Sequence, residues 1–193
     1  MRSGAGKQKG SAFERSICSL LSKWLTRGYR SDILWRSAMS GGRATVAHKK
    51  GQELAHVSGD ICAVHPLGHP FVAKFFCELK FYRDLRLGNV VAGKPSPLTT
   101  FWIKACEQAR DHQKIPMLIA KQNNLPILLC TNTMGRLWLN QSGTLIQTVV
   151  LPGMDMDVFL LDDVLATTSP FIVGTVSSKP KLKHARLAKE GKS

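Results

Sequence analysis

The sequence lacks the features that mark membrane-spanning and secreted proteins. No apolar run approaches the roughly 20 residues that a helix needs to cross a bilayer, so we expect no membrane-spanning segment. The basic residues 1–10 are not followed by an apolar core before Phe13, which argues against a secretory signal peptide. Internal repeats are absent as well. The absence of a signal peptide, together with cysteines that favour reduced thiols over disulfides, predicts a protein that works in the cytoplasm.

The cysteines follow no spacing that would indicate a disulfide framework or a zinc site. There are five, an odd number, with no Cys-x-x-Cys arrangement, and they lie in apolar runs. We therefore expect buried, reduced thiols. His65 and His69 lie in a segment rich in proline and glycine, and a solvated turn is a better interpretation of that segment than a metal site.

Acidic residues are scarce relative to basic ones. Lys and Arg number 27 against 13 Asp and Glu, which gives a net charge of +14. Residues 179–193 hold six Lys/Arg and one Glu, but the rest of the chain still carries +9. A chain this basic is expected to bind a polyanion, and with no membrane segment the favoured polyanion is nucleic acid.

Two short apolar segments carry charged residues where a buried strand normally has none. Residues 59–64 and 75–81 are rich in β-branched or aromatic residues, which is typical of strands. Because side chains alternate along a strand, Glu78 and Lys80 are expected to point to the same side. If the two strands pair as a hairpin, Asp60 falls beside Glu78. The alternative is a surface Glu/Lys pair on an edge strand, since Glu-x-Lys is a common tripeptide.

This combination of residues has a chemical logic. Mg²⁺ prefers oxygen ligands and is usually held by one or two carboxylates together with substrate phosphates, so Asp60 and Glu78 are candidate ligands. A metal at this position would lower the pKa of a bound water and stabilise charge on a phosphodiester. Lys80 is a candidate to orient that water or to offset the developing charge.

The first helix is expected to begin at Ser11. Ser11 and Glu14 have the spacing of a capping box, and the apolar residues between 13 and 25 keep helical periodicity. Glu14 is therefore either a helix cap or an acid that overhangs the carboxylate patch. Residues 1–10 would form a mobile basic arm whose charges can contact phosphate.

A strand is expected at residues 33–35, followed by a long polar segment. Residues 43–58 are basic and show no periodicity of their own; Arg43, Lys49 and Lys50 are the candidate phosphate contacts. A clamp on a phosphate backbone and a solvated loop are equally compatible with this composition.

The second half of the chain alternates helical and strand patterns. Thr100 is the expected N-cap of a helix whose aromatic residues are interpreted as core rather than as platforms for bases. In chain order we expect a helix at 98–112, strands at 116–120 and 125–131, a hairpin formed by 136–140 and 144–151, and a short helix or strand at 157–166.

The expected domain organisation is one core with additions at its ends. In chain order it comprises a flexible basic arm at 1–10, a core at 11–131 with a basic insertion at 41–58, a C-terminal extension at 132–175, and a basic disordered tail at 176–193.

The order of these elements resembles the PD-(D/E)XK nucleases. Five segments together are similar to the archaeal-type Holliday junction resolvases, and they extend over about two thirds of the chain. The segments are residues 9–15, 35–40, 59–61, 78–80 and 115–121. The resemblance implies an α/β restriction-endonuclease-like core of order αβββαβ, a mixed central sheet flanked by helices, here with a C-terminal β-rich extension.

The resemblance also implies roles for individual residues. Asp60 and Glu78 would bind Mg²⁺ or Mn²⁺, Lys80 would assist the attacking water, and Glu14 becomes an active-site carboxylate rather than a cap. The positions that match DNA-contacting or supporting residues of the family are Arg15, Arg36, Ser40 and Lys121. Such resolvases are homodimers that cut opposing strands of a four-way DNA junction. Small nucleases of this superfamily occur often in phages.

Two features depart from the resolvase pattern. Residues 41–58 intervene before Asp60, and residues 132–193 have no counterpart in that family. Despite these departures, the resemblance as a whole leads us to expect a metal-dependent endonuclease for branched DNA in recombination or replication. The alternatives are flap or nick processing, restriction-like scission of duplex DNA, a DNA-binding protein of the same fold without catalysis, and a basic packaging protein.

Overall fold

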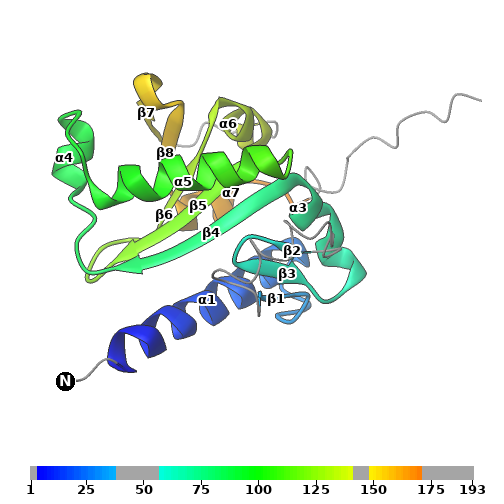
Figure 1. Ribbon diagram of the computed structural model, residues 1–193. Coiled ribbons are helices and arrows are strands. Elements are labelled where there is room, and N and C mark those ends of the chain that lie inside the picture. The colour runs from blue at the N-terminus through cyan, green and yellow to red at the C-terminus, as the bar shows by residue number, and fades with distance from the viewer. Residues whose placement is uncertain (1–3, 38–56, 141–147, 171–193) are drawn as a thin grey trace, which may run out of the picture.

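The computed structural model describes residues 4–37, 57–140 and 148–170. Its centre is a five-stranded mixed sheet of order β4-β5-β6-β8-β7 (Figure 1). The strands are β4 (Phe75–Tyr82), β5 (Ile115–Gln122), β6 (Leu128–Thr131), β7 (Thr148–Leu151) and β8 (Met156–Leu160). Strands β4 and β5 are parallel and the other pairs are antiparallel, which confirms the expected α/β class with a mixed sheet.

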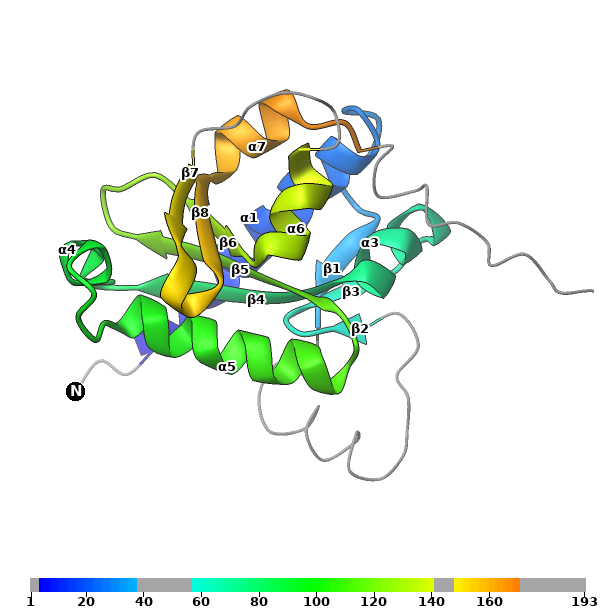
Figure 2. The same ribbon diagram turned by 90° about the horizontal axis from the view of Figure 1, so that it is seen from above.

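Helices cover both faces of this sheet (Figure 2). On one face lie α1 (Gly4–Leu25), α6 (Thr133–Leu139) and α7 (Leu161–Thr167), whose apolar residues form one core with Leu79 and Ile119. The other face packs against α4 (Leu87–Val91) and α5 (Pro97–Asp111) through Leu118 and Trp102. Because β5 is buried on both faces, its sequence is almost continuously apolar rather than alternating.

A small second sheet lies beside β4. It has the order β1-β3-β2, with β1 (Leu34–Arg36), β2 (Val57–Ser58) and β3 (Ile61–Ala63) all antiparallel. A parallel bridge between Gly59 and Cys77 joins it to β4. The expected strand at residues 33–35 is confirmed with a shift of one residue at each end.

The predicted hairpin between residues 59–64 and 75–81 is wrong. Strand β3 pairs with β1 and β2, and the segment expected to be the turn forms a 3₁₀ turn η1 (Pro66–Gly68) and the helix α3 (His69–Lys74). Phe71 and Val72 of α3 are buried, so this segment contributes to the core. Its prolines are at the starts of η1 and α3, where a missing N–H costs nothing.

Three other boundaries differ from expectation. Helix α1 begins at Gly4, so Ser11 lies inside the helix and is not its N-cap, and residues 4–10 are helical rather than a free arm. Helix α5 is capped by Ser96, in a capping box with Thr99, and not by Thr100.

The expected hairpin of residues 136–140 and 144–151 is also wrong. Helix α6 occupies the first segment, with the Asn132 side chain as its N-cap, and β7 pairs with β8. Because β8 pairs with β6, residues 148–160 extend the central sheet instead of forming a separate lobe. Residues 157–166, expected to be a helix or a strand, contain both: most of β8 followed by most of α7. A short 3₁₀ turn, η3 (Pro152–Met154), precedes β8. The basic tail at 176–193 lies outside the described residues.

Candidate active site

Asp60 is held against the edge of β4 by the turn between β2 and β3. Its backbone N–H donates to the carbonyl of Cys77 at 2.8 Å, and its Oδ2 accepts from the N–H of Leu79 at 2.8 Å. Gly59 has φ +67°, and a Cβ there would collide with the Cys77 carbonyl. A glycine at this position therefore allows the turn to approach β4 closely. The carboxylate of Asp60 occupies a strand edge that would otherwise expose an unpaired N–H.

Glu78 and Lys80 project from β4 toward the face covered by α5. Phe76, two residues before Glu78, stacks on His112 at the end of α5, which fixes the direction of this set of side chains. Lys80 Nζ forms an ion pair with Glu78 Oε1 and lies 3.9 Å from Asp60 Oδ2. The structure thus brings the two carboxylates and the ammonium together, by a different strand pairing from the one expected.

The electrostatics of this group follow from burial and from the proximity of like charges. Burial and, next in size, the charge of Glu78 raise the pKa of Asp60, while Lys80 opposes the shift; the net result is a pKa of about 6. For Lys80, burial lowers the pKa, but attraction to Glu78 and Asp60 outweighs burial and the net shift is upward. Lys80 therefore stays positively charged between the two acids at neutral pH.

Glu14 reaches the same region from helix α1 and pairs with Arg36 of β1. Arg36 Nη1 lies 3.3 Å from Glu14 Oε2 and donates to Ser11 Oγ at 2.8 Å. The charge of Glu14 raises the pKa of Asp60, although less than Glu78 does. Glu14 is thus a third acid whose charge acts on Asp60, and it forms an ion pair with the guanidinium of Arg36.

Two buried cysteines, Cys18 and Cys77, lie close to the acids of the site. Cys18 lies one helical turn after Glu14, and burial, together with the nearby Cys62, Glu14 and Asp60, raises the pKa of its thiol to about 12. Cys77 is fully buried, and burial raises the pKa of its thiol well above the usual range. These thiols are protonated and unreactive at neutral pH, as expected for structural cysteines.

The candidate DNA-binding residues are only partly located. Arg15 is exposed on α1 and donates to Ser11 Oγ at 3.0 Å, so Arg15 and Arg36 share one hydroxyl acceptor. Lys121 is in register with Phe81, which packs against Phe13 of α1. It therefore lies on the opposite face of the sheet from Glu78 and Lys80 and is not part of the carboxylate group. Ser40, Arg43, Lys49 and Lys50 lie outside the described residues.

The donor set suits a hard divalent cation that also binds substrate. Nowhere in the described ranges do three His, Cys, Asp or Glu side chains group closely enough to form a complete metal cage. Asp60 and Glu78 offer carboxylate oxygens, the ligand type of Mg²⁺ and Mn²⁺, and water and phosphate oxygens would complete the coordination. The residues present therefore fit a cation shared between protein and nucleic acid.

Two supporting groups were not found by sequence reasoning. Lys114, just before β5, donates to the carbonyl of Val57 at 3.2 Å and to Ser58 Oγ at 3.1 Å, and the Ser58 hydroxyl donates to the carbonyl of Phe75. These bonds fasten β2, and with it the Asp60 turn, to the central sheet. The second group is the aromatic ring of Phe101 on α5, whose centroid lies 5.9 Å from Lys80 Nζ. No local sequence signal indicates either contact.

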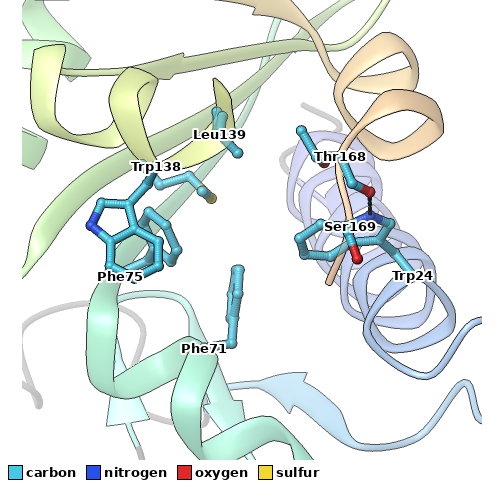
Figure 3. A pocket seen from close by; sticks show the side chains of 8 residues that line it. Trp24, Phe71, Phe75, Trp138, Leu139, Thr168 and Ser169 are labelled. Carbon is cyan, nitrogen blue, oxygen red and sulfur yellow. Dashed lines mark hydrogen bonds between the residues drawn. The ribbon is translucent and has the colours of Figure 1, made fainter. Parts of the chain in front are cut away.

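A separate apolar cavity of about 20 Å³ lies between α1, α3 and α6 (Figure 3). Trp24 on its wall donates from Nε1 to the carbonyl of Thr168 at 3.3 Å. The cavity holds space for a water molecule but not for a nucleotide, and none of the site acids lines it. It has no part in the site.

In the part of the chain that the structure describes, no helix has the length and apolar character needed to span a membrane.

Comparison with known proteins identifies the family. Residues 5–169 match the family model described as "Phage putative PDDEXK endonuclease". Neither the curated proteins nor the solved structures give a match. The matched range contains Glu14, Asp60, Glu78 and Lys80 and includes strands β7 and β8, so the C-terminal part of the sheet belongs to the family pattern. The chain is thus a member of this family of phage endonucleases within the PD-(D/E)XK superfamily.

Proposed function

We propose that the protein is a metal-dependent, structure-selective DNA endonuclease that hydrolyses phosphodiester bonds in branched DNA, as Holliday junction resolvases do. One observation carries the proposal: Asp60, Glu78 and Lys80 converge at the edge of β4, with Lys80 Nζ paired to Glu78 and 3.9 Å from Asp60. Two carboxylates and an ammonium in this arrangement suit hydrolysis of a phosphodiester better than they suit simple binding, because two acids repel a polyanion.

The roles of the residues follow from their environment. Mg²⁺ or Mn²⁺ held by Asp60 and Glu78 would lower the pKa of a water and stabilise negative charge on the phosphate. Lys80 stays charged and lies where it can hold the attacking water or offset charge that develops in the transition state. Glu14 adds negative charge beside this group, and Arg36 holds it in place.

DNA binding would rest on basic residues outside this group. The net charge of +14 leaves a large excess of Lys and Arg after the pairs of the site are counted. Arg15 on α1 is exposed beside Arg36, and a phosphate at this position would be contacted by both guanidinium groups. We further propose that the protein acts as a homodimer in the cytoplasm of the infected cell, since a four-way junction has two strands to be cut symmetrically.

The direct test is a substrate panel. Purified protein is incubated with a synthetic four-way junction, a flap and a linear duplex, each with Mg²⁺, Mn²⁺ or EDTA. We expect cleavage of the junction only when the metal is present, as paired nicks at symmetric positions in opposing strands. Light scattering in the same buffer should give the mass of a dimer.

Every other outcome contradicts a defined part of the proposal. Cleavage of only the flap or only the duplex would identify another endonuclease with the same site. Retention of DNA without any cleavage would indicate a binding protein that keeps the fold. Cleavage that persists in EDTA would rule out a role for the metal.

A further inference from the structure

An exposed tyrosine continues the row of site residues along β4. Tyr82 is the last residue of the strand and follows Lys80 on the same face. At about 3.3 Å per residue, its Cα lies about 7 Å along the strand from that of Lys80. Tyr82 is 45% exposed, although large aromatic side chains of this sheet such as Phe75 and Phe76 are buried. The ring is therefore available to a ligand that extends past Lys80.

Phe101 of α5 holds this ring in place. The two centroids lie 5.3 Å apart with an interplanar angle of 77°, an edge-on contact that leaves aromatic surface of Tyr82 uncovered. Lys80 Nζ lies 5.9 Å from the centroid of Phe101, within the range of a cation–π contact. Phe101 thus contacts both Lys80 and Tyr82, so the tyrosine is fixed relative to the candidate catalytic group. We call Tyr82 and Phe101 the aromatic shelf.

The residues around the aromatic shelf favour an anionic ligand with a flat apolar part. Arg83 and Arg86 follow directly in the chain and are exposed; Asp84 between them forms an ion pair with Arg86 at 3.9 Å, so one net positive charge remains in this segment. Lys104 lies one helical turn after Phe101 and is exposed as well. An exposed aromatic ring with cations at its border is the combination by which proteins bind a strand with unstacked bases.

We propose that the aromatic shelf binds one unpaired nucleobase next to the scissile phosphate, stacked on the ring of Tyr82. In paired DNA both faces of each base are covered by its neighbours, so a single ring at this place contributes only where a nucleotide is unpaired or can be extruded. The shelf then selects branch points, flaps and single-stranded gaps over continuous duplex. This inference rests on the proposed function and specifies how that site distinguishes its substrate.

A purely structural role for Tyr82 makes a different prediction. If the tyrosine only shields Phe101 from solvent, its replacement lowers stability and changes the affinity for all DNA forms equally. A stacking role changes the affinity only for DNA with an unpaired base. The two roles are therefore separable by binding measurements, without any cleavage.

The experiment measures binding in EDTA by the full-length protein. The probes are a junction or flap with 2-aminopurine as the first unpaired nucleotide, and a fully paired duplex of the same length. For the wild-type protein we expect quenched 2-aminopurine fluorescence. Tyr82→Leu should lose the quenching and bind the unpaired probe about 5-fold to 150-fold more weakly, the range for loss of one stacked base, with duplex affinity unchanged.

Matched variants control this test. Tyr82→Phe keeps the aromatic ring and should retain both the quenching and the affinity. Tyr29→Ala removes the other tyrosine of the chain, which follows the C-terminus of α1 and is 89% exposed. This variant should change neither the quenching nor the affinity. Thermal melting checks that Tyr82→Leu is folded, and leucine is chosen because it keeps an apolar cover over Phe101.

The results also separate this inference from the proposed function. Equal weakening for paired and unpaired probes, or wild-type quenching in Tyr82→Leu, would overturn the aromatic shelf even if junction cleavage proceeds. Selective loss of the unpaired probe in a protein that cuts none of the substrates would support the shelf while contradicting the proposed nuclease specificity.

Discussion

At the scale of single residues, the most unusual group is Asp60. Its side chain is almost completely buried, accepts a hydrogen bond from Leu79 and lies near Glu78, and its pKa is raised to about 6. In the unfolded chain the same carboxyl titrates near 4. Above pH 6 the folded protein therefore carries an ionised buried acid at a cost in stability. This cost disappears as the pH falls toward 4, because the folded state then holds a proton that the unfolded chain does not.

Asp60→Asn tests this reasoning. The amide oxygen can still accept the Leu79 N–H, but the charge is gone, so we expect the variant to be more stable than the wild type at pH 8 by about 1–3 kcal/mol. At pH 4 the difference should vanish. Urea unfolding at both values in EDTA measures this, with the exposed Asp111→Asn as control. A variant that is less stable at pH 8 would contradict the assigned pKa shift. Cleavage by Asp60→Asn should be lost at every pH.

Lys80 and Glu78 provide a second prediction. Lys80→Met and Glu78→Gln should each lower the cleavage rate by about 100-fold to 1,000-fold, because Lys80→Met removes the cation that would offset charge on the phosphate and Glu78→Gln removes a carboxylate that would hold the metal. Junction affinity in EDTA should stay nearly unchanged, because phosphate contacts come from other basic residues. Lys23→Met, at the exposed end of α1, removes the same charge and should cleave normally. Normal cleavage by either site variant would mean that the site is elsewhere.

At the scale of elements, the site depends on how a two-residue turn meets a strand edge. Strand β4 is at the end of the five-stranded sheet, and its outer edge accepts the backbone N–H of Asp60 and donates an N–H to the Asp60 side chain. Lys114 and Ser58 fasten the other end of the same turn. The position of the acid is therefore set by backbone contacts, which a side-chain pattern does not reveal.

Gly59→Ala should disrupt this contact. An added Cβ collides with the Cys77 carbonyl, and the positive φ is unfavourable for alanine, so the turn must move away from β4. We expect a loss of at least about 1 kcal/mol in stability. The cleavage rate should fall by about 100-fold, the usual effect of a misplacement of 1 Å. Gly88→Ala, in α4 with open space around it, is the control and should be neutral or slightly stabilising. Wild-type cleavage by Gly59→Ala would contradict the role of the close approach.

At the scale of the whole molecule, two cores on opposite faces of one sheet support a strongly basic chain. The family match ends at residue 169, and residues 179–193 lie beyond it with a net charge of +5. The matched range thus contains the site, whereas five of the fourteen net positive charges lie beyond it. Affinity for DNA and chemistry at the site are expected to be separable for this reason.

Salt dependence tests this separation. If about six phosphates are neutralised, raising the salt from about 50 to 200 mM should weaken junction binding by about 10³-fold. Deletion of residues 179–193 should reduce the slope of log affinity against log salt, because fewer counterions are released. Cleavage at low salt and saturating protein should stay at the wild-type rate. An unchanged slope would show that the terminal charges do not contact DNA, and lost cleavage would show that they are needed for chemistry.

The residue types of the site could be predicted from the sequence pattern, and the fold class from the resemblance that this pattern carries. Asp60 in one apolar run and Glu78 and Lys80 in the other were enough to predict a candidate metal site for phosphodiester chemistry, whereas the mixed α/β sheet was implied by the resemblance to the PD-(D/E)XK nucleases. These features are local, since strand alternation and helical periodicity act over a few residues. The resemblance added Glu14, which by local pattern alone is indistinguishable from a helix cap.

How these residues meet follows from the packing of the folded chain and was not predicted correctly. The expected hairpin is replaced by α3 and a parallel bridge at Gly59, and yet Asp60 still reaches Glu78, because either pairing places it at the same edge of β4. Other features also depend on residues far apart in the chain. They are the position of Lys121 on the opposite face of the sheet, the contact of Phe101 with Lys80 and Tyr82, and the hydrogen bonds from Lys114 to β2. Such contacts depend on how the layers pack, and no short-range pattern encodes them.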